Sequence, residues 1–207
     1  MKLFKTLFFL SMIAYSFLFC YVDLFMLGDK IFDSSEMAIF NGPHFNTGAY
    51  LHIVNAFLPS FFFLATSVLF MICVHCLEQD QKPSREYYFY LSQVWIFGFL
   101  GVLYQFMLHK LMARFLMVSP VWIVFVAAFL EFLLLATVSN LGELGEKTRG
   151  CIYKVAILFS IVVSMDILSS LQFRLSSPLQ EIAQTWASLF LFLFAWNVLS
   201  EKIVSLK

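Results

Sequence analysis

The chain has 207 residues, of which 61% are hydrophobic and 13% are charged. Soluble domains carry about 25% charged residues, so this composition excludes an ordinary water-soluble globule. The 13 basic and 13 acidic residues balance, which argues against a nucleic-acid-binding surface, and we expect no direct nucleic-acid partner.

Six apolar runs separated by short polar segments follow one another along the chain. They cover residues 7–27, 49–77, 87–108, 115–138, 151–171 and 182–199. A helix of about 20 residues crosses a hydrocarbon core of about 30 Å, and open strands are excluded in lipid because their edges stay unpaired. The sequence therefore predicts an all-α integral membrane protein, a polytopic bundle of about six transmembrane helices in a single domain over residues 1–207. Four or five spans are the alternative, because only residues 109–114 separate the third run from the fourth.

The N-terminal run has the outline of a signal peptide, with Lys2 and Lys5 before an apolar stretch. That stretch is longer than the signal-peptide core of about 7–15 residues, and no small-x-small cleavage site follows it. We expect an uncleaved signal anchor.

Basic residues in the loops predict the orientation, because short cytoplasmic loops accumulate Lys and Arg. With six spans and the N-terminus inside, the inner side holds nine of them: Lys2, Lys5, Lys82, Arg85, Lys147, Arg149, Lys154, Lys202 and Lys207. The outer side holds Lys30, Lys110, Arg114 and Arg174. Both termini are therefore predicted to be cytoplasmic, in a multi-pass protein of a bacterial inner (plasma) membrane.

Glycine and proline give few marks within the runs. Gly98 and Gly101 in the third run predict one patch where two helices approach closely. Pro59 and Pro120 are the only prolines within the second and fourth runs. Paired broken helices, which mark the central sites of many transporters, are therefore not evident.

Two acidic residues, Glu131 in the fourth run and Asp166 in the fifth, lie within predicted spans. An ionisable group at membrane depth costs a few kcal/mol or more and indicates function by default. At a rise of 1.5 Å per residue the two acids are separated by roughly 12 Å along the membrane normal, so they do not predict a carboxylate pair. Asp166 is placed at the depth of His52 and Asn55 in the second run. These four residues are candidates for interhelical or intersubunit bonds, or for a proton or ion route.

Cys73 and Cys76 form a C-x-x-C motif at the end of the second run. The predicted topology places them, with Cys151, near the cytoplasmic side, where thiols are kept reduced. Membrane disulfide-relay enzymes need a second cysteine pair in an outer loop, which Cys20 and Cys151 do not form. His75 projects about 100° away from Cys76 around the helix, so it completes a metal site poorly. We expect buried free cysteines, with a thiol-redox or metal site as the alternative.

Sequence signatures of catalysis are missing: there is no G-x-S-x-G, no H-E-x-x-H and no glycine-rich phosphate loop. We expect no enzymatic activity and no cofactor. The sequence favours a homo-oligomeric scaffold or sensor in the lipid bilayer that anchors a cytosolic protein, as in the membrane arm of a stress or phage-defence system. Its partner-facing loops carry Lys82, Arg85, Lys147 and Arg149. The alternatives are a small transporter or channel that uses Asp166 and Glu131, and a membrane thiol or metal protein that uses Cys73 and Cys76.

Overall fold

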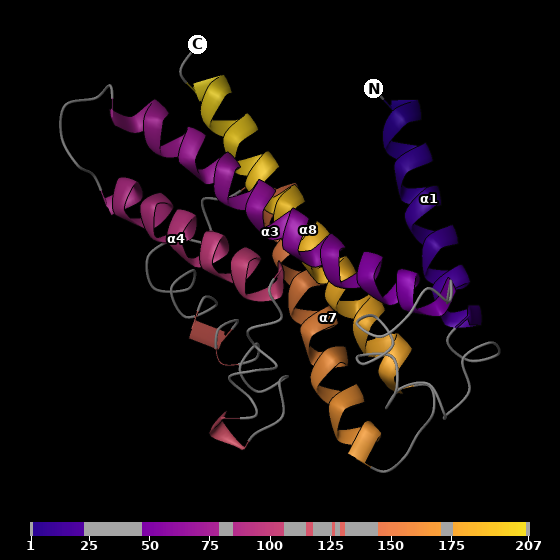
Figure 1. Ribbon diagram of the computed structural model, residues 1–207. Coiled ribbons are helices and arrows are strands. Elements are labelled where there is room, and N and C mark those ends of the chain that lie inside the picture. The colour runs from indigo at the N-terminus through magenta and orange to yellow at the C-terminus, as the bar shows by residue number, and fades with distance from the viewer. Residues whose placement is uncertain are drawn as a thin grey trace.

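The computed structural model describes residues 2–22, 47–78, 85–105, 115–117, 126, 129–130, 145–170 and 176–205. Over these ranges the long elements are five helices and no strand is present (Figure 1). The helices are α1 (Lys2–Tyr21), α3 (Thr47–Glu78), α4 (Arg85–Gln105), α7 (Glu146–Ser170) and α8 (Ser176–Ser205). The predicted all-helical class is confirmed for this part of the chain.

Three of these helices are long and apolar enough to cross a membrane, over Phe57–Leu77 in α3, Glu146–Met165 in α7 and Pro178–Val204 in α8. The apolar part of α1, Thr6–Tyr21, is shorter. α4 coincides with the third predicted run, but it is not among the three. The fourth predicted run lies almost entirely outside the described residues. Membrane insertion is therefore supported by three helices, and the predicted count of about six spans is not confirmed.

The helices α3 and α4 form an antiparallel pair (Figure 1). Early residues of α3 meet late residues of α4, since the hydroxyl of Ser60 donates to the carbonyl of Gly101 at 2.6 Å. About two helical turns further along α3, the Ser67 hydroxyl donates to the Val94 carbonyl at 2.8 Å. Both bonds connect a side chain of one helix to the backbone of the other, which requires the two helix axes to lie close together.

Close approach is possible because α4 has glycine where α3 crosses it. A Cβ atom built on Gly101 would lie 2.6 Å from Cγ of Leu64 and 3.2 Å from its backbone nitrogen. At Gly98 the nearest atom would be Oγ of Ser67, at 3.3 Å. The predicted glycine patch is therefore confirmed as a helix–helix contact.

The helix α8 runs parallel to α3 and antiparallel to α7. Thr185 in the first part of α8 bonds Asn55 in the first part of α3, and later residues pair Phe194 with Phe70. Against α7 the order is reversed, since Thr148 at the start of α7 bonds a carboxylate near the end of α8. The consecutive helices α3 and α4, and likewise α7 and α8, thus pack antiparallel. In the parallel pair, α3 and α8, the bonded residues lie more than 100 positions apart in the chain.

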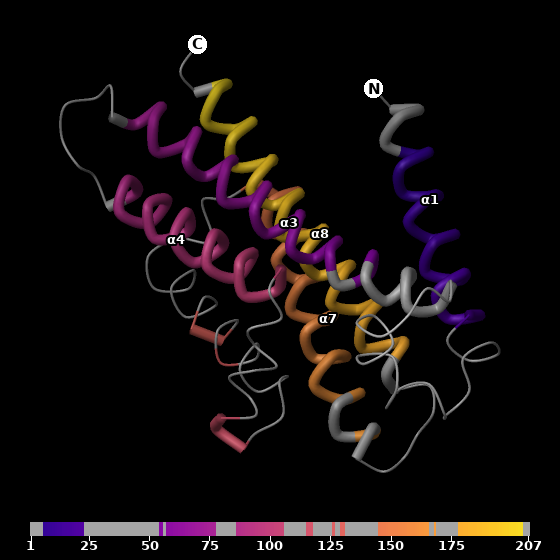
Figure 2. The backbone as a smooth tube through the Cα atoms, viewed as in Figure 1, coloured from indigo at the N-terminus to yellow at the C-terminus, as the bar shows by residue number. Residues whose placement is uncertain are grey.

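The helix α1 packs against the middle of α8 in the opposite direction. The ring of Phe9 stacks on Trp186 with centroids 6.0 Å apart, and Met12 lies in a buried cluster with Phe62 and Leu189. Figure 2 shows that the start of α1 and the end of α8 lie toward the same end of the bundle. These directions agree with the alternation that the predicted topology requires.

An aromatic core joins α3, α4 and α8. Phe70, which is completely buried, stacks on Tyr90 and Phe97 of α4 with ring centroids 5.8 and 6.0 Å away. On its other side Phe194 of α8 lies at 6.1 Å. Flat rings supply large contact areas with few rotatable bonds, so the abundant phenylalanine of this sequence serves packing between helices as well as the lipid-facing surface.

Several helix boundaries differ from the predicted ones, among them the starts of α7 and α8. α7 begins at Glu146 and α8 at Ser176, whereas the apolar pattern predicted starts at residues 151 and 182. Polar first turns explain the difference, because helices accept acidic side chains such as Glu146 near their N-terminus, where the helix dipole favours negative charge. The hydrogen bond from the Arg149 nitrogen to the Gly145 carbonyl, 3.0 Å long, closes the first turn of α7.

Candidate functional site: two polar clusters at opposite ends of the bundle

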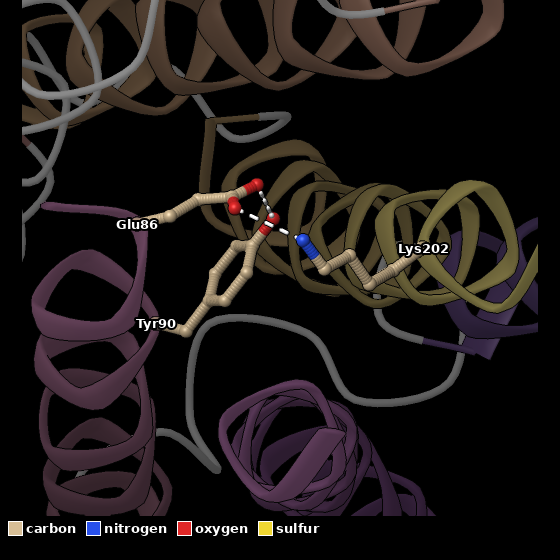
Figure 3. Close-up of polar contacts among 3 residues, drawn as sticks. All are labelled: Glu86, Tyr90 and Lys202. Carbon is tan, nitrogen blue, oxygen red and sulfur yellow. Dashed lines mark hydrogen bonds and ion pairs between the residues drawn. The ribbon is translucent and has the colours of Figure 1, made fainter. Parts of the chain in front are cut away.

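Polar side chains gather at the end of the bundle where α8 terminates, which we name the Lys202 end. Its centre is the Glu86 cluster, formed by Glu86 and Tyr90 of α4 and Lys202 of α8 (Figure 3). The Lys202 ammonium donates to Oε2 of Glu86 at 3.0 Å, and the Tyr90 hydroxyl donates to Oε1 at 3.1 Å. Each carboxylate oxygen therefore has its own donor, one charged and one neutral.

Burial differs among the three members of the Glu86 cluster. The side chain of Glu86 is 50% exposed and that of Lys202 is 18% exposed, while Tyr90 is buried. The cluster thus extends from the surface into the bundle. Because half of the Glu86 side chain remains accessible, the ion pair stabilises only modestly, and its main effect is to fix the start of α4 beside the end of α8.

A second set of contacts at the same end ties α7 to α8. The hydroxyl of the buried Thr148 donates to Oε1 of Glu201 at 2.7 Å. One turn deeper, the Asn197 amide lies 3.6 Å from the sulfur of Cys151. The last turns of α8 are therefore connected through side chains to the first turns of both α4 and α7.

Two of the predicted partner-facing residues lie on this assembly. Lys147 and Arg149 are exposed and flank the buried Thr148 in the first turn of α7. They stand on a helix and not in a loop, which corrects the predicted loop boundary. Arg85 is the first residue of α4, although its side chain lies outside the described part, and Lys82 falls outside the described residues altogether.

At the opposite end of the bundle lies the Asn55 cluster, formed by Tyr15, Asn55, Glu181 and Thr185. The side-chain amide of Asn55 donates to Oε2 of Glu181 at 2.9 Å. Its carbonyl oxygen accepts from the Thr185 hydroxyl at 3.1 Å and, more weakly, from Tyr15 at 3.4 Å. Asn55 and Thr185 are buried. One asparagine thereby joins three helices.

A neighbouring contact supports the Asn55 cluster from α1. The indole nitrogen of Trp186 donates to the Ser16 hydroxyl at 3.0 Å, and that hydroxyl donates to the Met12 carbonyl at 2.9 Å. A buried indole N–H usually needs a partner, so this bond fixes the rotation of α1 against α8. Trp186 thereby connects α8 to α1 through a polar contact as well as through its ring.

The four predicted intramembrane polar residues have different outcomes. Asn55 is in the cluster just described. His52 lies in α3 and Asp166 in α7, but their side chains are outside the described part, and Glu131 is outside the described residues. The sequence placed Asn55 at the depth of Asp166, whereas the acid that Asn55 contacts in the structure is Glu181.

Glu181 was missed because the sixth apolar run was taken to begin one residue after it. α8 in fact starts at Ser176, five residues before Glu181. A signal was present in the sequence, since Glu181, Thr185 and Ser188 are spaced four and three residues apart and so share one helix face. Thr185 and Ser188 are both buried on that face.

All four cysteines are free thiols. Cys73 and Cys151 are buried in the same apolar cluster, and Cys76 is half-buried. His75 is exposed, on another side of the helix from Cys73. No group of three metal-binding side chains occurs in the part of the chain that the structure describes.

Comparisons with protein-family models, curated proteins and solved structures found no match to this chain. The two polar clusters and the bundle that positions them are therefore the features of this chain that bear on its function.

Proposed function

We propose that the protein is a non-enzymatic subunit of a bacterial inner membrane, an oligomeric scaffold or sensor that holds a cytosolic protein at the Lys202 end. The observation that carries this proposal is that side-chain contacts hold the first turns of α4 and α7 against the last turns of α8. Glu86 bonds Lys202, and Thr148 bonds Glu201, so α4 and α7 are both attached to α8. Lys147 and Arg149 remain exposed on that fixed base.

A fixed base favours binding because less conformational freedom is lost when a partner docks. Two exposed cations in one helical turn favour a partner with an acidic surface, which electrostatic attraction would orient. The positive-inside distribution supports the cytoplasm as the side that this end faces.

Site-specific photo-crosslinking in native membranes tests the proposal. A photoreactive residue at position 147 or 149 should give one discrete adduct with a cytosolic protein. The matched control is position 95, because Trp95 is 73% exposed on α4, where lipid is expected to surround it. Adducts at 147 that equal those at 95, or no protein adduct at either, would contradict the scaffold.

A second experiment tests whether Lys147 and Arg149 contribute to binding of the partner. Replacing Lys147 and Arg149 together by Gln should weaken the adduct formed from a photoreactive residue placed at position 146, without changing the amount of protein in the membrane. Arg174→Gln is the control, because the segment 171–175 connects α7 to α8 at the other end of both helices. An unchanged adduct in the double variant would show that these cations do not contribute.

A small transporter or channel is the second candidate, and the Asn55 cluster favours it. A carboxylate bonded to a buried asparagine between apolar helices is typical of proton or ion routes. Glu181→Gln keeps the size of the side chain and removes its charge. Ion or proton flux into vesicles that contain the purified protein, and loss of that flux in this variant, would support transport; equal flux with and without protein would eliminate it.

A further inference from the structure

Gln93, in the middle of α4, has a fully buried side chain. Neither its amide nitrogen nor its amide oxygen has a hydrogen-bond partner within the described part of the chain. An amide in an apolar interior without partners is costly, and native proteins keep such groups rarely and for a reason. Gln93 therefore needs an explanation that the packing of the helices does not supply.

The position of Gln93 limits what can reach it. Tyr90 precedes it by three residues and Phe97 follows it by four, so the three share one face of α4. Both rings stack on Phe70 of α3, and the hydroxyl of Tyr90 bonds Glu86 beside Lys202. Along α4, Gln93 thus lies between Phe97 and Tyr90, and Tyr90 joins the aromatic core to the Glu86 cluster.

The direction of the side chain favours the polar side of this position. Long side chains on a helix lean toward its N-terminus, which for Gln93 means toward Tyr90 and the Glu86 cluster. Side chains three residues apart on a helix have Cβ atoms about 5–6 Å apart. Tyr90 is therefore the neighbour of Gln93 on this face, and its hydroxyl, which bonds Glu86, is a polar group on the side toward which the Gln93 amide leans.

We propose that Gln93 binds buried water, which connects its amide to the Tyr90 hydroxyl and so to the Glu86 cluster. The Gln93 N–H donates to the water, and the water donates to the oxygen of Tyr90 or to the Gln93 carbonyl. The Tyr90 oxygen can accept, because its own proton is used toward Glu86. Buried waters usually make about three hydrogen bonds to groups that would otherwise be unsatisfied. The Lys202 half of the bundle then contains a short hydrated path that begins at the half-exposed Glu86 and ends at Gln93.

Proton-detected solid-state NMR on the full chain in lipid bilayers tests this directly. With glutamine side chains labelled with nitrogen-15, the Gln93 amide signal is assigned by its loss in Gln93→Met, or in Gln93→Asn if the first variant does not accumulate. Magnetisation transfer from water to this amide is the expected result. Gln105, exposed at the end of the same helix, is the positive control. Transfer to Gln105 with none to Gln93 would overturn the proposal.

Thermal unfolding gives an independent answer. If water bridges the two groups, Gln93→Met and Tyr90→Phe each lower the unfolding temperature, and the double variant loses less than their sum, because both remove the same bridge. If the amide is simply unsatisfied, replacing it by an apolar side chain of similar shape raises the unfolding temperature. A rise in Gln93→Met, or strict additivity, would therefore overturn the proposal. Gln105→Met is the matched control and should leave the unfolding temperature unchanged.

Discussion

The side chain of Asn55 in α3 donates a hydrogen bond of 2.9 Å to the carboxylate of Glu181 in α8, across 126 positions of sequence. The side-chain oxygen of Asn55 accepts a hydrogen bond from the hydroxyl of Thr185, which lies on the same helix as Glu181. The two helices run parallel, and this contact fixes their register at one end while Phe70 and Phe194 fix it further along. An amide suits this role because it donates to the acid and accepts from the hydroxyl at once.

Asn55→Leu should therefore destabilise the folded bundle by about 1–3 kcal/mol, since it removes the hydrogen bond that the Asn55 amide donates to a half-buried carboxylate. The free energy of unfolding in mixed detergent micelles, followed by loss of helical circular dichroism, measures the effect. Val54→Ala is the control, because Val54 is 45% exposed next to Asn55 in the chain. A loss in Val54→Ala as large as that in Asn55→Leu would show that the effect is not specific to the cluster.

Two glycines should respond to alanine in opposite ways. Gly101→Ala places a methyl group 2.6 Å from Cγ of Leu64 and 3.2 Å from its backbone nitrogen, and such overpacking costs about 1–3 kcal/mol. Gly150→Ala meets nothing within 4 Å and removes a flexible residue from α7, which should stabilise the helix by about 0.5–1 kcal/mol. Unfolding of both variants in the same micelles tests the difference in sign. Equal effects would mean that α4 does not touch α3 at Gly101.

The pair formed by Glu86 and Lys202 should contribute little stability of its own. A double-mutant cycle with Glu86→Gln and Lys202→Met is expected to give a coupling of about 0.2–1 kcal/mol. That coupling should fall when salt is raised, because the carboxylate is half exposed and therefore screened. A coupling well above this range, unchanged by salt, would indicate that the pair is buried in the membrane-embedded protein.

The orientation of the bundle can be measured with single cysteines introduced into a variant whose native cysteines are replaced by alanine. A membrane-impermeant maleimide should label positions 147 and 201 only from the cytoplasmic side, since both lie at the Lys202 end. Position 174, between α7 and α8, should be labelled only from the outer side. Labelling of positions 147 and 174 from one side would refute the proposal that α7 crosses the membrane.

The local features were well anticipated where one stretch of chain determines them. The apolar runs that fall within the described residues are helices, and the glycine pair at Gly98 and Gly101 is a close helix contact, because small residues allow this regardless of which partner supplies the other side. Lys147 and Arg149 are exposed, and their role toward a partner stays a prediction. Their assignment to a loop was wrong, because a polar first turn of a helix carries no apolar signal.

The partners of polar residues could not be predicted in the same way. Asn55 was recognised as a polar residue that would need a bond, but Glu181 was not paired with it. In a helix that is apolar on nearly all sides, the sequence pattern does not distinguish the face that meets protein from the face that meets lipid. The spacing of Glu181, Thr185 and Ser188 marks one polar face of α8, but it does not show that this face meets Asn55 of α3.

The sequence by itself determined an apolar, helical chain and the accumulation of charge at the ends of its runs, because backbone hydrogen bonding within a helix is local and lipid permits little else. Only the tertiary structure decided that α3 lies parallel to α8, that Glu86 meets Lys202, and that Gln93 is buried without a partner in the described residues. These relationships depend on side-chain fit between helices far apart in the chain, and fit is a property of two surfaces together.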